Sequence, residues 1–137
     1  FHSNENYDNF KVFDFEKMVF FGSEEQFKVL RDYVEENYSD RVNIFGSGDN
    51  VMDIVSKKCS KGNSLRIIAD DMGIATDEIM VFGDNENDLS MLCEAGYPVA
   101  MANSKSFVLE KIKTHTKKTN YEGGVGEYLL EFFHDKF

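Results

Sequence analysis

The sequence predicts an α/β fold in which a small α+β region precedes a parallel sheet with helical crossovers. Two observations predict it. From residue 62 onward, short apolar runs alternate with segments of helical periodicity, which is the order typical of a parallel sheet. Before residue 57, a strand pattern, a helix pattern and two strand patterns joined by a hairpin signal follow one another. The 137 residues suffice for one ordinary domain or for parts of two.

The first region reads as strand, helix and hairpin. Residues 17–21 are an apolar run that Gly22 ends. Ser23 followed by Gln26 has the pattern of a capping box and predicts a helix to about residue 37. One side of that helix carries its apolar residues, Phe27, Leu30, Val34 and Tyr38. Two further strands are predicted over 41–45 and 50–55, joined by a Gly-Ser-Gly-Asp loop.

The second region alternates helices and strands. The predicted order is helix 62–73, strand 79–83, helix 87–95, strand 98–102, helix 105–113, strand 115–118 and helix 125–135. Gly73 and Gly96 are expected to end helices, and Ser104 to cap the start of one. The last helix should bury an apolar stripe in the core, made of Val125, Leu129, Phe132 and Phe133.

Composition excludes several classes of function. The formal net charge of -10 argues against a nucleic-acid surface. No apolar stretch approaches the length of a membrane span, so no membrane partner is expected. Two cysteines make no disulfide framework, which favours a reducing compartment and a cytoplasmic location. The three histidines lack the spacing of zinc ligands.

The segment from Gly83 to Asp88 is the most informative part of the sequence. An apolar run ends at Gly83, and Asp84 and Asp88 follow before a helical pattern, which places carboxylates where parallel sheets bind ligands. Hard cations such as Mg²⁺ prefer such oxygen ligands. A calcium-binding EF-hand loop is excluded, because Leu89 and Ala95 stand where it needs Gly and Glu. Two interpretations stay open, a solvated turn with a capping Asp and a metal and phosphate site.

Lys61 is the expected partner of these carboxylates. It stands at the start of the helix predicted from residue 62, where the helix dipole already supplies partial positive charge. A lysine there is explained if a phosphate or a carboxylate lies nearby. The alternative is a lysine that simply faces solvent.

These motifs together resemble the haloacid dehalogenase (HAD) superfamily, and in particular the Cof-type phosphatases with an α/β cap. The matching segments, in chain order, are Lys61-Gly62, Gly83-Asp84-Asn85-Glu86-Asn87-Asp88-Leu89-Ser90-Met91-Leu92, Ala95-Gly96, Val99-Ala100-Met101-Ala102-Asn103 and Glu122-Gly123-Gly124-Val125. The resemblance implies a partial HAD-like Rossmannoid parallel sheet preceded by the second half of an α+β cap. Residues 1–56 would be the C-terminal part of the cap and residues 57–137 the C-terminal part of the core domain.

The resemblance also implies a chemistry, a Mg²⁺-dependent phosphohydrolase that acts on small phosphorylated metabolites through an aspartyl-phosphate. Asp84 would be a metal ligand. Asp88 would support the metal and the catalytic Lys61, which neutralises charge at the phosphoryl group. Asn87 and Asn103 would bind the phosphate or the substrate.

One departure from the family pattern matters for function. The Asp-x-Asp-Gly-Thr motif that carries the family's nucleophile is absent, and residues 12–16 imitate it without the second Asp and the Gly-Thr turn. The chain is therefore expected to be the C-terminal part of a longer protein, with the nucleophile outside it. Alone, the chain is expected to be inactive. Self-association, or pairing with the missing N-terminal part, is expected at strand 79–82. The alternatives are a phosphomutase or sugar-phosphate phosphatase of the same superfamily, and a non-catalytic acidic α/β interaction module.

Overall fold

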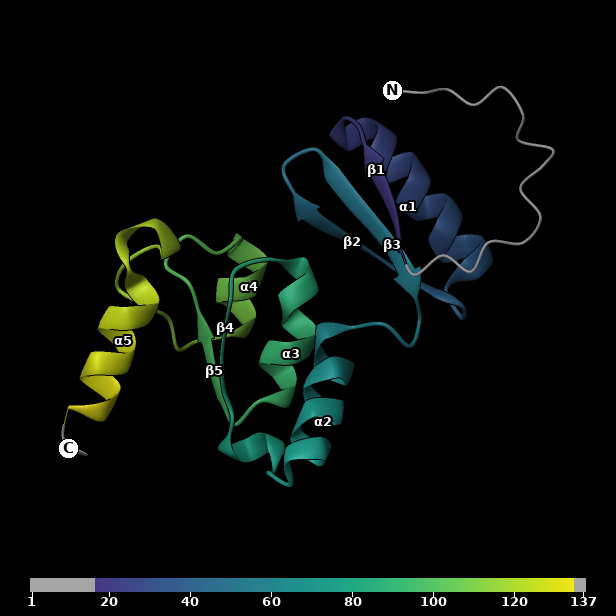
Figure 1. The fold of residues 1–137 in the computed structure, drawn as a ribbon. Helices are drawn as coiled ribbons and strands as arrows, with labels where there is room; N and C mark the ends of the chain where they lie inside the picture. The colour runs from purple at the N-terminus through teal and green to yellow at the C-terminus, as the bar shows by residue number, and fades with distance from the viewer. Residues whose placement is uncertain (1–16, 135–137) are drawn as a thin grey trace, which may run out of the picture.

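The computed structural model describes residues 17–134, which form an antiparallel sheet of three strands and a parallel sheet of two (Figure 1). Helices accompany both sheets, so the predicted α/β class with a parallel sheet is confirmed. The segment 12–16, which imitates the missing nucleophile motif, lies outside the described residues.

The antiparallel sheet is built from strands β1 (Lys17–Phe21), β2 (Val42–Gly48) and β3 (Val51–Ser56), in the order β1-β3-β2. Helix α1 (Glu24–Tyr38) lies against it, and Val34, Met52 and Ile54 are buried in this layer (Figure 1). The predicted capping box is present. The Ser23 hydroxyl accepts from the Gln26 N–H at 3.4 Å, and the Gln26 side chain accepts from the Ser23 N–H at 2.9 Å.

The hairpin between β2 and β3 differs from the prediction. Strand β2 runs to Gly48, and the turn is formed by Asp49 and Asn50. A bulge between Gly46 and Gly48 absorbs one extra residue, so the glycine-containing segment stays paired. Asn50 has φ 59°, a left-handed conformation that Asn tolerates well. The predicted four-residue loop is therefore wrong.

Residues 57–60 lead from β3 to helix α2 (Lys61–Met72). The Ser60 hydroxyl caps this helix by accepting from the Asn63 N–H at 3.0 Å. Gly73 ends it in the left-handed conformation, and its N–H donates to the last carbonyls. The predicted ends of this helix are thus correct to within one residue.

The parallel sheet pairs β4 (Met80–Gly83) with β5 (Tyr97–Ala100). The strand predicted over 115–118 is reduced to a single bridge between Ala100 and His115. The parallel pairing goes no further, because the Ala102 N–H donates its hydrogen bond to the Thr116 hydroxyl at 2.9 Å and not to the Thr116 carbonyl. No described strand lies along the other edge of β4.

Short helices flank the parallel sheet. They are η2 (Thr76–Glu78), η3 (Glu86–Asp88), α3 (Leu89–Glu94), α4 (Ser106–Lys111), η4 (Asn120–Glu122) and α5 (Gly124–Phe133). In Figure 1, α3 and α5 lie on opposite sides of the sheet. The buried core of this part consists of Val81, Leu92, Ala100, Val108 and Ile112. The predicted helix 87–95 consists of two elements, the 3-10 turn η3 followed by α3, and η3 shapes the loop after β4.

Helix α5 is covered less than predicted. Tyr128 and Phe132 meet Phe82 and Tyr97 edge-on, with ring centroids 5.7 Å apart in both pairs. Phe133, however, stays 38% exposed, and the rest of the predicted stripe is only half-buried. The reason is geometric, because the described sheet under this helix is only two strands wide.

Two predicted helix caps are also wrong. The Ser104 hydroxyl donates to the Gly83 carbonyl at 3.3 Å, and α4 starts after Lys105 without a side-chain cap. Helix α3 ends at Glu94, and Gly96 does not take the left-handed conformation of a helix-ending glycine. Gly96 is instead required by a close approach, since a Cβ there would lie 1.9 Å from the Asp77 carbonyl oxygen.

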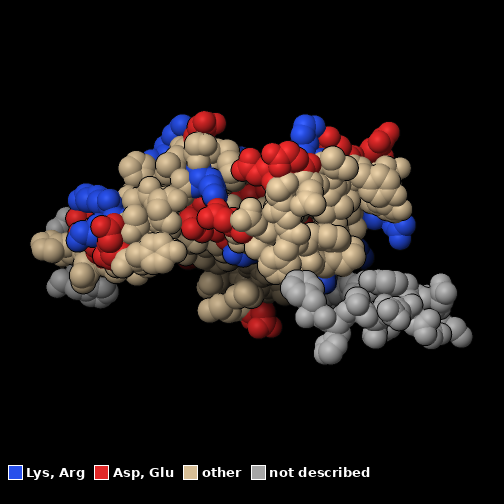
Figure 2. Space-filling model, turned by 90° about the horizontal axis from the view of Figure 1, so that it is seen from above, with Lys and Arg blue, Asp and Glu red and all other residues tan. Residues whose placement is uncertain are grey.

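The surface agrees with the acidic composition. Figure 2 shows acidic and basic side chains interspersed over one face, with acidic patches near its middle and no continuous basic area. Within residues 17–134, no helix is both long and apolar enough to cross a membrane. Cys59 and Cys93 are both free.

Candidate active site

The loop after β4 is organised by the buried carboxylate of Asp88, which is 5% exposed. One of its oxygens, Oδ2, accepts from the backbone N–H groups of Asp84 at 2.9 Å and Asn85 at 3.2 Å. The loop therefore folds back on its own end and holds Asp84 at the carboxyl end of the strand. This is the edge at which parallel sheets bind ligands.

The other oxygen of Asp88, Oδ1, forms an ion pair with the ammonium of Lys61, 27 residues earlier. Lys61 lies in the first turn of α2, which packs against α3. Gly62 makes that packing possible, because a Cβ there would lie 2.5 Å from the Ser90 carbonyl oxygen. The Gly62 N–H also donates to the Ser90 hydroxyl at 3.0 Å. The Lys-Gly pair thus brings the ammonium to the carboxylate.

The two carboxylates titrate in opposite directions. Burial alone would raise the pKa of Asp88, but the hydrogen bonds from Lys61 and from the Asp84 and Asn85 N–H groups hold that pKa below its ordinary value. Burial, together with the charge of Asp88 and a hydrogen bond with it, raises the pKa of Asp84, against the opposing charge of Lys61. The ionised form of Asp84 is therefore disfavoured, and a cation bound nearby would stabilise it.

The donor set fits a hard cation that is only partly bound by protein. Asp84 and Asp88 bring two carboxylates together against the single ammonium of Lys61. Among residues 17–134, no group of three or more His, Cys, Asp or Glu side chains gathers as a metal-binding cage. Mg²⁺ typically takes one or two carboxylates and completes its six oxygen ligands with water and substrate phosphate. The residues present fit that ion.

The two predicted asparagines lie in different surroundings. Asn87 precedes Asp88 on η3 and lines, with Glu86 and Ser90, a cavity of about 440 Å³ that also touches β2 and α1. The Asn103 side-chain oxygen accepts from the Asn120 N–H at 3.1 Å and so holds the η4 segment. The structure thus brings Lys61, Asp84 and Asp88 together with Asn87 beside them, while Asn103 contacts a different loop.

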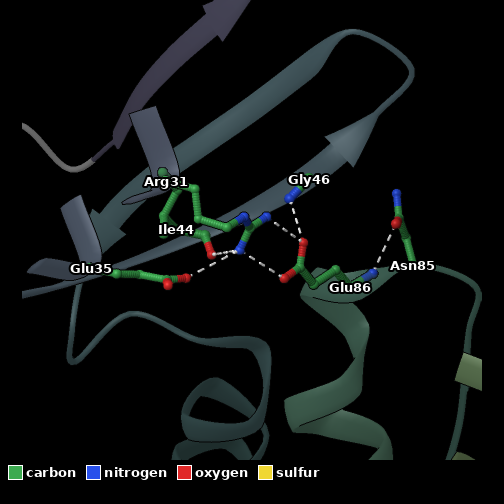
Figure 3. Close-up of polar contacts among 6 residues, drawn as sticks. All are labelled: Arg31, Glu35, Ile44, Gly46, Asn85 and Glu86. Carbon is green, nitrogen blue, oxygen red and sulfur yellow. Dashed lines mark hydrogen bonds and ion pairs between the residues drawn. The ribbon is translucent and has the colours of Figure 1, made fainter. Parts of the chain in front are cut away.

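Sequence reasoning missed Arg31 and Glu86. Glu86 lies in the same loop as Asp84 and Asp88, yet its side chain points towards α1 and β2 (Figure 3). There it binds the guanidinium of Arg31, which is 55 residues earlier. Arg31 stands four residues after Phe27 and three before Val34, so it falls on the apolar side of the predicted helix. A charged residue there was the available signal of a contact, but nothing in the sequence named Glu86 as its partner.

Comparison with known proteins identifies the family of this chain. The sequence profile of the haloacid dehalogenase-like hydrolases matches residues 2–129. A phosphoglycolate phosphatase of Methanobrevibacter smithii is 36% identical over 95 residues, which are 69% of this chain and 40% of that protein. A 5-amino-6-(5-phospho-D-ribitylamino)uracil phosphatase of Bacillus subtilis is 31% identical over 122 residues, 88% of this chain and 45% of that protein.

The fold agrees as well. The solved structure of a haloacid dehalogenase-like hydrolase from B. subtilis superposes with a TM-score of 0.77 at 29% identity, covering 88% of this chain and 42% of the other. The chain spans less than half the length of each of these three proteins. Because the family profile covers nearly all of the sequence, the resemblance seen in the motifs is confirmed, and the chain belongs to the haloacid dehalogenase-like hydrolase family.

Proposed function

We propose that this chain is the C-terminal part of a Mg²⁺-dependent phosphatase that acts on small phosphorylated metabolites. The observation that carries the proposal is the buried Asp88, ion-paired to Lys61 and adjacent to Asp84. The phosphatases among the relatives support the choice of substrate class. Residues 1–56 would belong to the cap and 57–137 to the core, a division supported by the change from antiparallel to parallel pairing.

Each residue of the site would have a distinct role. Lys61 carries three N–H donors on a half-exposed ammonium, so it can contact phosphoryl oxygens while Asp88 holds it in place. Asp84 and Asp88 would hold Mg²⁺, which when bound neutralises and orients the phosphate. Asn87 would donate a hydrogen bond from its amide to the phosphate or the substrate. Asn103 would contribute its amide N–H₂ at the rim, since its oxygen is already bonded.

The covalent step requires a residue from outside this chain. In the proposed reaction, the carboxylate of an Asp outside the chain forms a bond to phosphorus as the bond to the leaving oxygen breaks, and that oxygen takes a proton from an acid that also lies outside this chain. Water then hydrolyses the acyl phosphate and restores the carboxylate. Lys61 stabilises the oxygens of the phosphoryl group while its charge redistributes.

The alternatives predict different behaviour. A phosphomutase would transfer the phosphoryl group between substrate positions, and a sugar-phosphate phosphatase would prefer phosphorylated sugars. A non-catalytic interaction module has no need for Lys61 near Asp84, whereas here the charge of Lys61 acts on Asp84 and opposes the rise of its pKa. That proximity favours the enzymatic proposal.

The proposal is tested by assaying the full-length protein and the 137-residue chain side by side. The panel contains p-nitrophenyl phosphate, phosphoglycolate, a ribityl phosphate and several sugar phosphates, each with Mg²⁺ or with EDTA. The full-length protein should release phosphate only with Mg²⁺, and the chain alone should release none. Failure of the full-length protein on every compound would contradict the proposal. Turnover by the chain alone that Asp84→Ala abolishes would show that the nucleophile lies within it.

A further inference from the structure

Glu86 makes a set of contacts that the phosphate chemistry does not need. Its Oε1 and Oε2 accept from the two terminal nitrogens of Arg31 at 3.2 and 3.0 Å, and Oε2 also accepts from the Gly46 N–H at 2.7 Å (Figure 3). The two side chains are only 30% and 32% exposed. A forked, partly buried Arg–carboxylate pair is among the stronger polar contacts in proteins, because both N–H···O bonds form at once.

The contact covers a specific strand edge. Strand β2 is at the edge of the antiparallel sheet. The Ile44 carbonyl accepts from Arg31 Nη1 at 3.2 Å, and the Gly46 N–H donates to Glu86. Arg31 and Glu86 therefore bond to alternate residues of β2, at the positions where a neighbouring strand would bind. The Arg31–Ile44 bond joins α1 to β2, but the Gly46 N–H of this edge is satisfied in this way only while the sheet rests on η3.

The same contact reaches the loop that carries Asp84 and Asp88. The Glu86 N–H donates to the Asn85 side-chain oxygen at 2.8 Å, and the Asn85 N–H donates to Asp88. A second bridge joins the hairpin turn to the core, from Lys105 to Asp49 at 3.2 Å, but it is exposed and therefore weak. The partly buried contact at Glu86 is thus the main polar link between the antiparallel sheet and the loop that carries Asp84 and Asp88.

We infer that Arg31 and Glu86 form a latch, a pair of positioning residues that fixes the β1–β3 sheet against the loop of Asp84 and Asp88. Neither residue touches the reacting atoms. The latch acts by holding the loop and the overlying sheet in one relative position, so that Lys61, Asp84 and the substrate meet in a fixed geometry. The kinetic part of this inference rests on the proposed phosphatase function, and the structural part does not.

The test uses the full-length protein with Arg31→Lys and Glu86→Gln, which keep size and most of the polarity but lose the fork or the charge. The matched control is Arg66→Lys. Arg66 pairs with Glu94 at 3.2 Å between α2 and α3, away from β2. Thermal unfolding checks that all three variants fold. Hydrogen exchange of the Gly46 amide reports the latch directly, and kcat and KM report its effect on the site.

The latch predicts that Arg31→Lys speeds exchange of the Gly46 amide about tenfold, although Arg31 does not contact that amide. It also predicts a fall of about tenfold in kcat/KM, while Arg66→Lys stays within about twofold of wild type on both measures. If Arg31→Lys and Arg66→Lys show the same exchange rate of the Gly46 amide and the same kcat/KM, the inference is overturned. Faster exchange with unchanged kcat/KM in both latch variants would overturn the positioning role. If the wild-type protein shows no phosphatase activity, the proposed function fails, and Gly46 exchange alone decides the latch.

Discussion

Asp84→Asn in the full-length protein is expected to lower kcat at saturating Mg²⁺ by about 10²- to 10³-fold, the cost typical of losing one charge-stabilising group in an active site. Asn keeps the shape of Asp84 but lacks the negative charge that a hard cation prefers. The stability of the fold should not fall. The raised pKa of Asp84 means that its charge is disfavoured in the folded state, so the neutral variant should unfold at the same or a higher temperature.

The measurement combines steady-state kinetics over a range of Mg²⁺ concentrations with thermal unfolding. Asp71→Asn is the matched control, because Asp71 is exposed on α2 and away from the loop. It should change neither rate nor stability. An Asp84→Asn enzyme that keeps more than about a tenth of the wild-type rate would contradict the proposed role of Asp84.

The second large effect concerns stability. Gly96→Ala should destabilise the folded protein by about 3 kcal/mol, at the upper end of the usual cost of overpacking. The new Cβ would lie 1.9 Å from the Asp77 carbonyl oxygen and 2.5 Å from its carbon, and backbone atoms cannot move aside easily. The Gly96 N–H donates to the Thr76 carbonyl at 2.9 Å, so separating the two segments would also weaken that bond.

Gly126→Ala is the control for this prediction. Gly126 lies within helix α5, and a Cβ added there would have no neighbouring atom within 4 Å, so alanine should be neutral or stabilise by about 0.5–1 kcal/mol. Urea unfolding of both variants in the full-length protein measures the difference. Equal midpoints for the two variants would show that the turn between α3 and β5 adapts to a side chain.

Local sequence signals predicted the parts of the fold that depend on neighbouring residues. The capping box of Ser23 and Gln26 and the termination of α2 at Gly73 involve groups only a few residues apart. The loop from Gly83 to Asp88 is local in the same sense, because Asp88 bonds to N–H groups three and four residues away. Such contacts can be read from spacing alone.

Other features depend on where distant elements meet. The latch needs Arg31 on α1, the edge of β2 and the turn η3 to come together, and no spacing in the sequence encodes that meeting. The extent of β2 depended on a bulge that keeps Gly46 and Gly48 paired. The half-covered state of α5 depended on the width of the sheet beneath it, which the helical periodicity of its own residues does not specify.

The central claim is that Lys61 and Asp84 act within one site, and a double-mutant cycle on kcat/KM tests it most directly. Lys61→Met and Asp84→Asn are made singly and together in the full-length protein. Residues that serve one transition state are strongly non-additive. We therefore expect the double variant to lose about as much activity as the worse single variant. Losses that simply multiply would contradict the claim, because they would mean that Lys61 and Asp84 act independently.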